Sequence, residues 1–242
     1  MGRDADKLDT YRRKRHFDTT GEPRGASTRP GSVGDESAPC FVVQLHDAST
    51  LHFDFRLEVD GVLKSWSVPK GPSADPGDKR LAIPTEDHPL EYRDFEGVIA
   101  QGEYGAGTVI VWDEGTYRPL THDKTYATSH GTDHAKSHDK SDRDAHRPRR
   151  EKDQPVPFAA ALEDGHISFW LDGTKLHGGY ALTRFRGGAG ERESWLLVKQ
   201  GDAGTARQRG RPVPSRARSA RTGRTLGQVV AQERHAHGGE GT

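Results

Sequence analysis

One segment of the chain alternates strictly between hydrophobic and polar positions. Between residues 51 and 59 the odd positions are apolar, and the even positions are His52, Asp54, Arg56 and Glu58. A period of two is typical of a half-buried β-strand, and Asp60-Gly61, which follows, is a favoured two-residue hairpin turn. The polar face of this predicted strand therefore carries a histidine, an aspartate and an arginine in succession.

Other short segments with the same character predict the rest of the fold. We expect strands at 41–45, 62–68, 80–84, 107–113, 166–171, 174–177, 179–186 and 194–199. Many short strands separated by turn signals indicate an all-β fold, either an antiparallel sandwich or a barrel. The expected helices are short ones: a partly helical segment before Lys14 and one helix near 224–233.

Bulky apolar residues concentrate in two stretches, 41–119 and 158–200, so an apolar content of only 31% still permits one core. We predict a β domain over 41–200, preceded by a basic, largely flexible arm at 1–40 and followed by an Arg-rich disordered tail at 201–242. Residues 121–155 are rich in His, Asp, Lys and Ser, which bury too little surface to offset ordering entropy. This segment is therefore predicted to be a disordered insertion.

The charges balance overall, with 36 basic and 36 acidic residues, but both ends are basic. Residues 1–30 hold eight Lys or Arg against five Asp or Glu, and residues 203–242 hold eight Arg against two Glu. Basic ends are common in nucleic-acid-binding proteins, although they also occur as solubilising sequence. The chain has no apolar run near the ~18 residues of a membrane span, no apolar signal segment and a single cysteine, Cys40. We therefore expect a soluble, cytoplasmic protein.

The polar face of the predicted strand has the composition of a metal and phosphate site. His52 and Asp54 point the same way, and His46 has the same parity if the strand structure extends that far. Imidazole and carboxylate groups bind divalent metals, and Arg56 on the same face suits an anionic ligand. The competing interpretation is that this is an ordinary solvated strand face. Downstream candidates have simple structural explanations when taken singly: Lys64, Lys70, Arg80, His88 and Tyr92.

Together, the motifs resemble a known family. They are Phe41-Val42-Val43-Gln44-Leu45-His46-Asp47-Ala48, Leu51-His52-Phe53-Asp54-Phe55-Arg56-Leu57, Leu63-Lys64-Ser65-Trp66-Ser67-Val68-Pro69-Lys70-Gly71-Pro72, Glu86-Asp87-His88-Pro89-Leu90-Glu91-Tyr92, Phe95-Glu96-Gly97 and Gly102-Glu103-Tyr104-Gly105-Ala106-Gly107-Thr108-Val109. In this order they resemble the 3′-phosphoesterase domain of bacterial DNA ligase D. The resemblance resumes at 165–199 and includes 11–23 of the arm.

This resemblance implies a compact antiparallel β-barrel with short flanking helices and a Mn²⁺-dependent site on its concave face. Co²⁺ or another divalent transition metal is compatible with the same ligand types. The implied metal ligands are His46, His52 and Asp54. Phosphate contacts are implied for Arg56, Lys70 and Arg80, and a place at the catalytic centre for His88 and Tyr92. In the arm, Arg15 and Glu22 match substrate-binding positions, whereas His16 stands where the family pattern has Asp.

The resemblance also implies a function: removal of 3′-terminal ribonucleotides and 3′-phosphates, which leaves a ligatable 3′-hydroxyl in end-joining repair. The implied partners are DNA 3′ ends and primer–templates with a terminal ribonucleotide, with no membrane, in the bacterial cytoplasm at the nucleoid. The chain is too short to hold polymerase and ligase domains and has no Lys-x-Asp-Gly motif, so we expect a stand-alone enzyme beside a separate ATP-dependent DNA ligase and Ku. Two alternatives remain: a non-catalytic DNA-end-binding module, and an unrelated cupin-like metalloenzyme acting on a small molecule.

Overall fold

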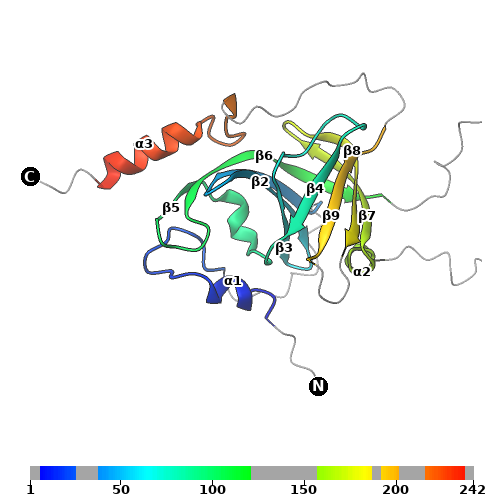
Figure 1. The fold of residues 1–242 in the computed structure, drawn as a ribbon, viewed down its shortest axis with the longest axis horizontal. Helices are drawn as coiled ribbons and strands as arrows, with labels where there is room; N and C mark the ends of the chain where they lie inside the picture. Colours follow the sequence, from blue (N-terminus) through cyan, green and yellow to red (C-terminus); the bar gives the residue numbers. More distant parts are fainter. Residues whose placement is uncertain (1–5, 26–37, 121–156, 187–191, 202–215, 238–242) are drawn as a thin grey trace, which may run out of the picture.

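The computed structural model describes residues 6–25, 38–120, 157–186, 192–201 and 216–237. These residues form nine strands and a few short helices (Figure 1). In chain order the elements are α1 (Asp9–Arg13), β1 (Cys40–Asp47), β2 (Leu51–Val59), β3 (Val62–Val68), β4 (Lys79–Pro84), the 3-10 helix η1 (Leu90–Asp94), β5 (Gly97–Ile99), β6 (Gly107–Pro119), α2 (Phe158–Asp164), β7 (His166–Gly173), β8 (His177–Arg186), β9 (Ser194–Lys199) and α3 (Leu226–His237).

The sheet closes into a barrel of eight strands. Neighbouring strands follow the order β1-β2-β3-β4-β9-β8-β7-β6, and β6 pairs back with β1. Every pairing is antiparallel, and β5 is a short additional strand on β6. The structure thus confirms the all-β fold and decides between sandwich and barrel, because no edge remains between β1 and β6.

The strongest local signals predicted the correct elements. The predicted bounds of β2, β3 and β9 agree with the structure, and Asp60 and Gly61 form the hairpin turn with φ values of 50° and 79°. The predicted strand at 174–177 is wrong, since 174–176 form the turn between β7 and β8. The buried Asp113 carboxylate accepts the backbone N–H groups of Lys175 and Leu176 at 2.8 Å, which fixes that turn.

The alternation along β1 and β2 places two different environments on their two faces. The odd positions, such as Phe53, Phe55 and Leu57, point into the main core inside the barrel. The even positions lie against a second, smaller apolar cluster formed by Tyr11, Val42, Leu63, Tyr92 and Val111. Because α1 and η1 supply Tyr11 and Tyr92 to that cluster, the polar face of β2 is covered rather than solvated.

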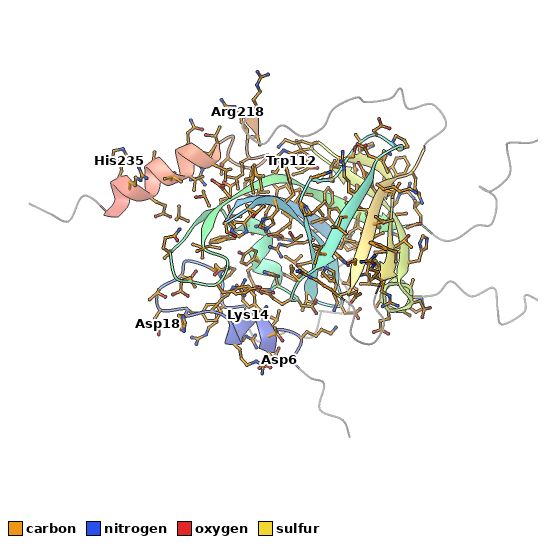
Figure 2. The ribbon with its side chains drawn as sticks, in the orientation of Figure 1. Asp6, Lys14, Asp18, Trp112, Arg218 and His235 are labelled. Atoms are coloured by element: carbon orange, nitrogen blue, oxygen red, sulfur yellow. The ribbon has the colours of Figure 1, made fainter. Side chains whose placement is uncertain are left out.

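Both ends of the chain contribute described segments that pack on the barrel. In the N-terminal arm, Tyr11 is fully buried, and Lys14 lies where α1 meets the barrel (Figure 2). In the C-terminal segment, α3 covers the region of the expected short helix, and Val229 is buried. The division into arm, domain and tail stays a prediction, and the predicted insertion at 121–155 lies outside the described residues. No described helix combines the length and apolar character needed to cross a membrane.

Candidate active site

Two histidines and an aspartate converge at one end of the β1–β2 hairpin. The antiparallel register places His46 directly opposite His52 and Gln44 opposite Asp54, all on the face away from the main core. One potential ligand atom from each of His46, His52 and Asp54 lies within 4.8 Å of the other two. Among the described residues, this is the one group of at least three such side chains with this geometry.

The separations suit a shared metal ion. Asp54 Oδ2 lies 3.8 Å from His46 Nδ1, and Asp54 Oδ1 lies 3.5 Å from His52 Nε2. Ligand atoms that are each ~2.1 Å from one metal can stand at most ~4.2 Å apart. Both histidine–aspartate separations fall within that limit before any adjustment. The spacing of Asp54 from each histidine is therefore compatible with a shared divalent cation.

Backbone carbonyls orient the two imidazoles for this role. His46 Nε2 lies 2.9 Å from the Gly105 carbonyl oxygen, and His52 Nδ1 lies 2.7 Å from that of Thr50. A carbonyl can only accept a hydrogen bond, so each of these nitrogens carries the proton. Without a metal, these rings can donate from His46 Nδ1 and His52 Nε2 to Asp54; when the rings are neutral, the same two atoms carry the lone pairs that a metal would use. Such an outer hydrogen bond is the usual way in which a protein fixes a metal-binding histidine.

Arg56 joins the candidate metal ligands to a buried hydrogen-bond network. Its guanidinium donates to Asp54 Oδ2 at 3.0 Å, Gln44 Oε1 at 2.8 Å and Ser65 Oγ at 2.8 Å, and it lies 2.9 Å from His88 Nδ1. Burial alone would raise the pKa of Asp54, but Arg56 and the two histidines hold it well below its usual value. Asp54 is therefore ionised at neutral pH.

His88 lies between two arginines. Arg56 Nη1 is near its Nδ1, and Arg15 Nη2 is 3.3 Å from its Nε2, while the Glu86 carbonyl oxygen is 2.8 Å from Nδ1. Burial, together with the positive charges of Arg56 and Arg15, holds the pKa of His88 well below its ordinary value. The ring is consequently neutral when the cavity holds no anion.

The arm completes the network from the other side. Arg15 donates to Glu22 Oε1 at 2.9 Å and to Glu86 Oε1 at 3.0 Å, and its guanidinium lies over the Tyr11 ring. Tyr92 donates its hydroxyl hydrogen to Glu22 Oε1 at 2.9 Å, and burial and Glu22 raise its pKa well above normal. Glu22 is therefore enclosed by protein groups, where it positions Arg15 and Tyr92.

These side chains surround one open cavity of about 180 Å³. Most of the residues expected at the site line it, namely Arg15, His46, His52, Asp54, Arg56, His88 and Tyr92. Glu22 and two expected phosphate contacts do not. Lys70 is exposed in the turn after β3, and Arg80 is a buried residue of β4 that donates to Asp78. Their assignment as phosphate ligands stays a prediction.

The structure adds participants that sequence reasoning missed. Gln44 holds Arg56 and also donates to the carbonyls of Tyr92 and Phe95, and Ser65 and Glu86 are hydrogen-bonded within the network. Gln44 shares the parity of His46, so the alternation could have identified it. His16 points largely into solvent and contacts Glu103, outside the network.

Comparison with known proteins identifies the family of this chain. The model of the DNA ligase D 3′-phosphoesterase domain matches residues 44–184, more than half of the chain. The chain belongs to the DNA ligase D 3′-phosphoesterase domain family. The matched stretch contains all three candidate metal ligands, together with Arg56, His88 and Tyr92.

Several relatives of this phosphoesterase-family chain are multifunctional proteins. It is 46% identical over 195 residues to the multifunctional non-homologous end joining protein LigD of Pseudomonas aeruginosa, covering 81% of this chain and 19% of that protein. It is 54% identical over 113 residues to the multifunctional non-homologous end joining DNA repair protein LigD of Mycobacterium tuberculosis, covering 47% of this chain and 14% of that protein. It is 36% identical over 203 residues to the multifunctional non-homologous end joining protein LigD of Mycolicibacterium smegmatis, covering 84% of this chain and 22% of that protein. The chain thus spans about a fifth or less of the length of these relatives.

Proposed function

We propose that this chain is a metal-dependent phosphoesterase that processes DNA 3′ ends for end-joining repair. It removes 3′-phosphates and 3′-terminal ribonucleotides and leaves a 3′-hydroxyl that a ligase can seal. The observation that carries the proposal is the convergence of His46, His52 and Asp54 beside Arg56 and His88 in one cavity. Membership of the phosphoesterase family and similarity to end-joining proteins support it.

The proposed metal is Mn²⁺, with Co²⁺ or another divalent transition metal as a substitute, because the ligand set mixes two imidazoles with one carboxylate. His46 Nδ1, His52 Nε2 and an Asp54 oxygen would hold it. A metal bound there supplies Lewis-acid stabilisation of the negative charge on a phosphoryl oxygen.

Arg56 would bind and orient the phosphate. Among the described residues, its guanidinium donates to Asp54, Gln44 and Ser65 and lies beside His88 Nδ1, and a guanidinium has five N–H donors. These contacts leave at least one N–H for a phosphoryl oxygen, and the buried partners hold the guanidinium in place before the substrate arrives. Such preorganised donors are effective because no reorganisation is needed when charge develops.

His88 would act on the leaving oxygen. In the free protein, burial and the charges of Arg56 and Arg15 keep its pKa low and the ring neutral. A phosphate dianion offsets those positive charges and favours the imidazolium, which can then donate a proton to the departing alkoxide. Positioned acid catalysis of this kind contributes typically ~10²–10⁴-fold to the rate.

Purified protein tests the proposal directly. With Mn²⁺ and a primer–template that ends in a 3′-phosphate, we expect release of inorganic phosphate; with a terminal ribonucleotide, we expect its removal, but no removal of a terminal deoxynucleotide. His52→Ala is expected to abolish release while DNA binding persists. His177→Ala is the matched control, because His177 is also paired with an aspartate, Asp172, but on exposed parts of β7 and β8.

Failure of the wild-type protein to release phosphate, with DNA binding intact, would favour a non-catalytic DNA-end-binding module. The proposed setting, the bacterial nucleoid with a separate ATP-dependent DNA ligase and Ku, is tested by sealing of 3′-blocked ends. Adding the chain to ligase and Ku should permit sealing, and omission of Mn²⁺ should prevent it.

A further inference from the structure

One large aromatic side chain is exposed at the rim of the cavity. Tyr104 is 48% exposed, and only Leu81 and Phe185 are comparably exposed among the large hydrophobic residues of the described chain. Of these three, Tyr104 alone lines the cavity that holds the candidate metal ligands. An aromatic ring that is half in solvent beside a polar cavity has no role in the barrel core.

The turn that carries Tyr104 is fixed to the site. It joins β5 to β6, and Gly102 and Gly105 on either side of the tyrosine have positive φ values of 94° and 79°. The carbonyl of Gly105 accepts the hydrogen bond from His46 Nε2. Tyr104 therefore directly precedes the residue whose carbonyl is hydrogen-bonded to the candidate metal ligand His46.

A positive charge lies next to the ring. Lys14 donates to the Tyr104 hydroxyl at 3.1 Å, its Nζ lies 4.4 Å from the ring centroid, and it also bonds Glu86 at 3.1 Å. The Arg15 guanidinium lies 5.6 Å from the same centroid. The rim thus combines an aromatic face with cationic groups, the pairing that single-stranded nucleic acid prefers.

The size of the cavity decides which part of a substrate reaches this rim. Sites that enclose an entire small molecule usually measure ~300–1,000 Å³, whereas this cavity measures about 180 Å³. It suits a phosphate with part of its sugar. The base attached to that sugar then stays outside, at the level of the exposed tyrosine.

We propose that Tyr104 is the stacking surface for the terminal nucleobase of the 3′ end whose phosphate enters the cavity. The inference rests on the proposed function and adds how the end is gripped. Stacking on a ring tolerates any base, because every base has a π face. An enzyme built this way acts on ends of any sequence but binds an end more tightly when the last nucleotide carries a base.

Binding and turnover of two matched ends test the inference. Both are primer–templates with a 3′-phosphate; in one the last nucleotide carries thymine, and in the other it is an abasic tetrahydrofuran analogue. We expect the wild-type protein to bind the base-bearing end roughly 5- to 140-fold more tightly than the abasic end. Tyr104→Ala should lose this preference through Kd and KM with little change in kcat, and Tyr104→Phe should retain it.

Phe185→Ala is the matched control, because Phe185 is equally exposed but does not line the cavity, and it should behave as wild type. Equal binding of the two ends by the wild-type protein would overturn the inference. So would an equal loss on both ends in Tyr104→Ala, since that would assign the ring to support of its turn. Base- and Tyr104-dependent binding without any phosphate release would uphold the stacking surface and refute the proposed catalysis.

Discussion

Replacing Arg15 tests how strongly the buried charges around the cavity depend on one another. Arg15 is paired with two carboxylates, those of Glu22 and Glu86, whose side chains are only 0% and 4% exposed. Glu86 would keep Lys14 as a cationic partner, but Glu22 would keep only the hydroxyls of Tyr92 and Thr20 among the described residues. Arg15→Met therefore leaves a buried carboxylate without a positive charge.

The magnitude follows from that difference. Removing one partner of a buried ion pair costs about 3–5 kcal/mol, because the other charge stays buried and uncompensated. Glu22→Gln alone should cost only ~1–2 kcal/mol, since Arg15 keeps Glu86 and the amide can still hydrogen-bond. In the Arg15→Met background, Glu22→Gln should instead stabilise the protein, because it removes the uncompensated charge.

The assay is urea unfolding of the four proteins at neutral pH with a chelator present, followed by tryptophan fluorescence. We expect a coupling free energy of about 3 kcal/mol between the two positions. Arg13→Met is the control, because the Arg13–Asp9 pair is 71% and 58% exposed and should contribute little. If the effects of Arg15→Met and Glu22→Gln were additive, the two side chains would not form the buried pair on which the reasoning depends.

Three further predictions follow from single positions. His52→Ala should weaken Mn²⁺ binding at least about 100-fold by calorimetry, and unchanged affinity would exclude this residue as a ligand. Glu86→Gln should be less stable than the wild-type protein above pH 4.5. Burial raises the pKa of Glu86, but hydrogen bonds from its own backbone and from its cationic partners outweigh burial and lower the pKa from 4.5, so the ionised carboxylate stabilises the protein fully above that pH and less as the pH falls further. A difference in melting temperature that persists in acid would contradict this reasoning. Gly107→Ala should lower the free energy of unfolding by about 3 kcal/mol or more, measured by thermal unfolding, because the added Cβ would lie 2.3 Å from the Asp47 carbonyl oxygen at a φ of 149°. Gly61→Ala is the control and should cost less, because there is open space around Gly61. Equal losses of stability in the two variants would refute the steric argument.

The sequence could predict most of the strands and the grouping of the candidate metal ligands because both depend on strand parity, whereas the choice of a barrel over a sandwich came from the family resemblance. Alternation put His52, Asp54 and Arg56 on one face, and the hairpin turn at Asp60-Gly61 fixed where the strand ended. The partner strand then brought His46 opposite His52 by register alone. Local periodicity carries this kind of information well.

Contacts between distant segments were beyond that reasoning. Glu86 comes from a loop 71 residues away from Arg15, and no local pattern says that the arm folds back to meet it. The same limit applies to Ser65, whose hydroxyl becomes a site group only because β3 lies beside β2. Lys70 was assigned by motif resemblance alone; it lies exposed outside the cavity, and its role as a phosphate contact stays a prediction.

The balance of charge in this network explains why a metal and a phosphate would bind there together. Six charged side chains are joined around the cavity: the cations of Lys14, Arg15 and Arg56, and the anions of Glu22, Asp54 and Glu86. These six charges sum to zero. The free protein therefore has no net repulsion within the network, but the six side chains together also exert no net attraction on a phosphate dianion. A divalent cation on the two histidines and Asp54 would change the sum by two, which equals the charge of the dianion. Phosphate recognition at this site is therefore expected to depend on the metal, while Arg56 and His88 give the bound group its orientation.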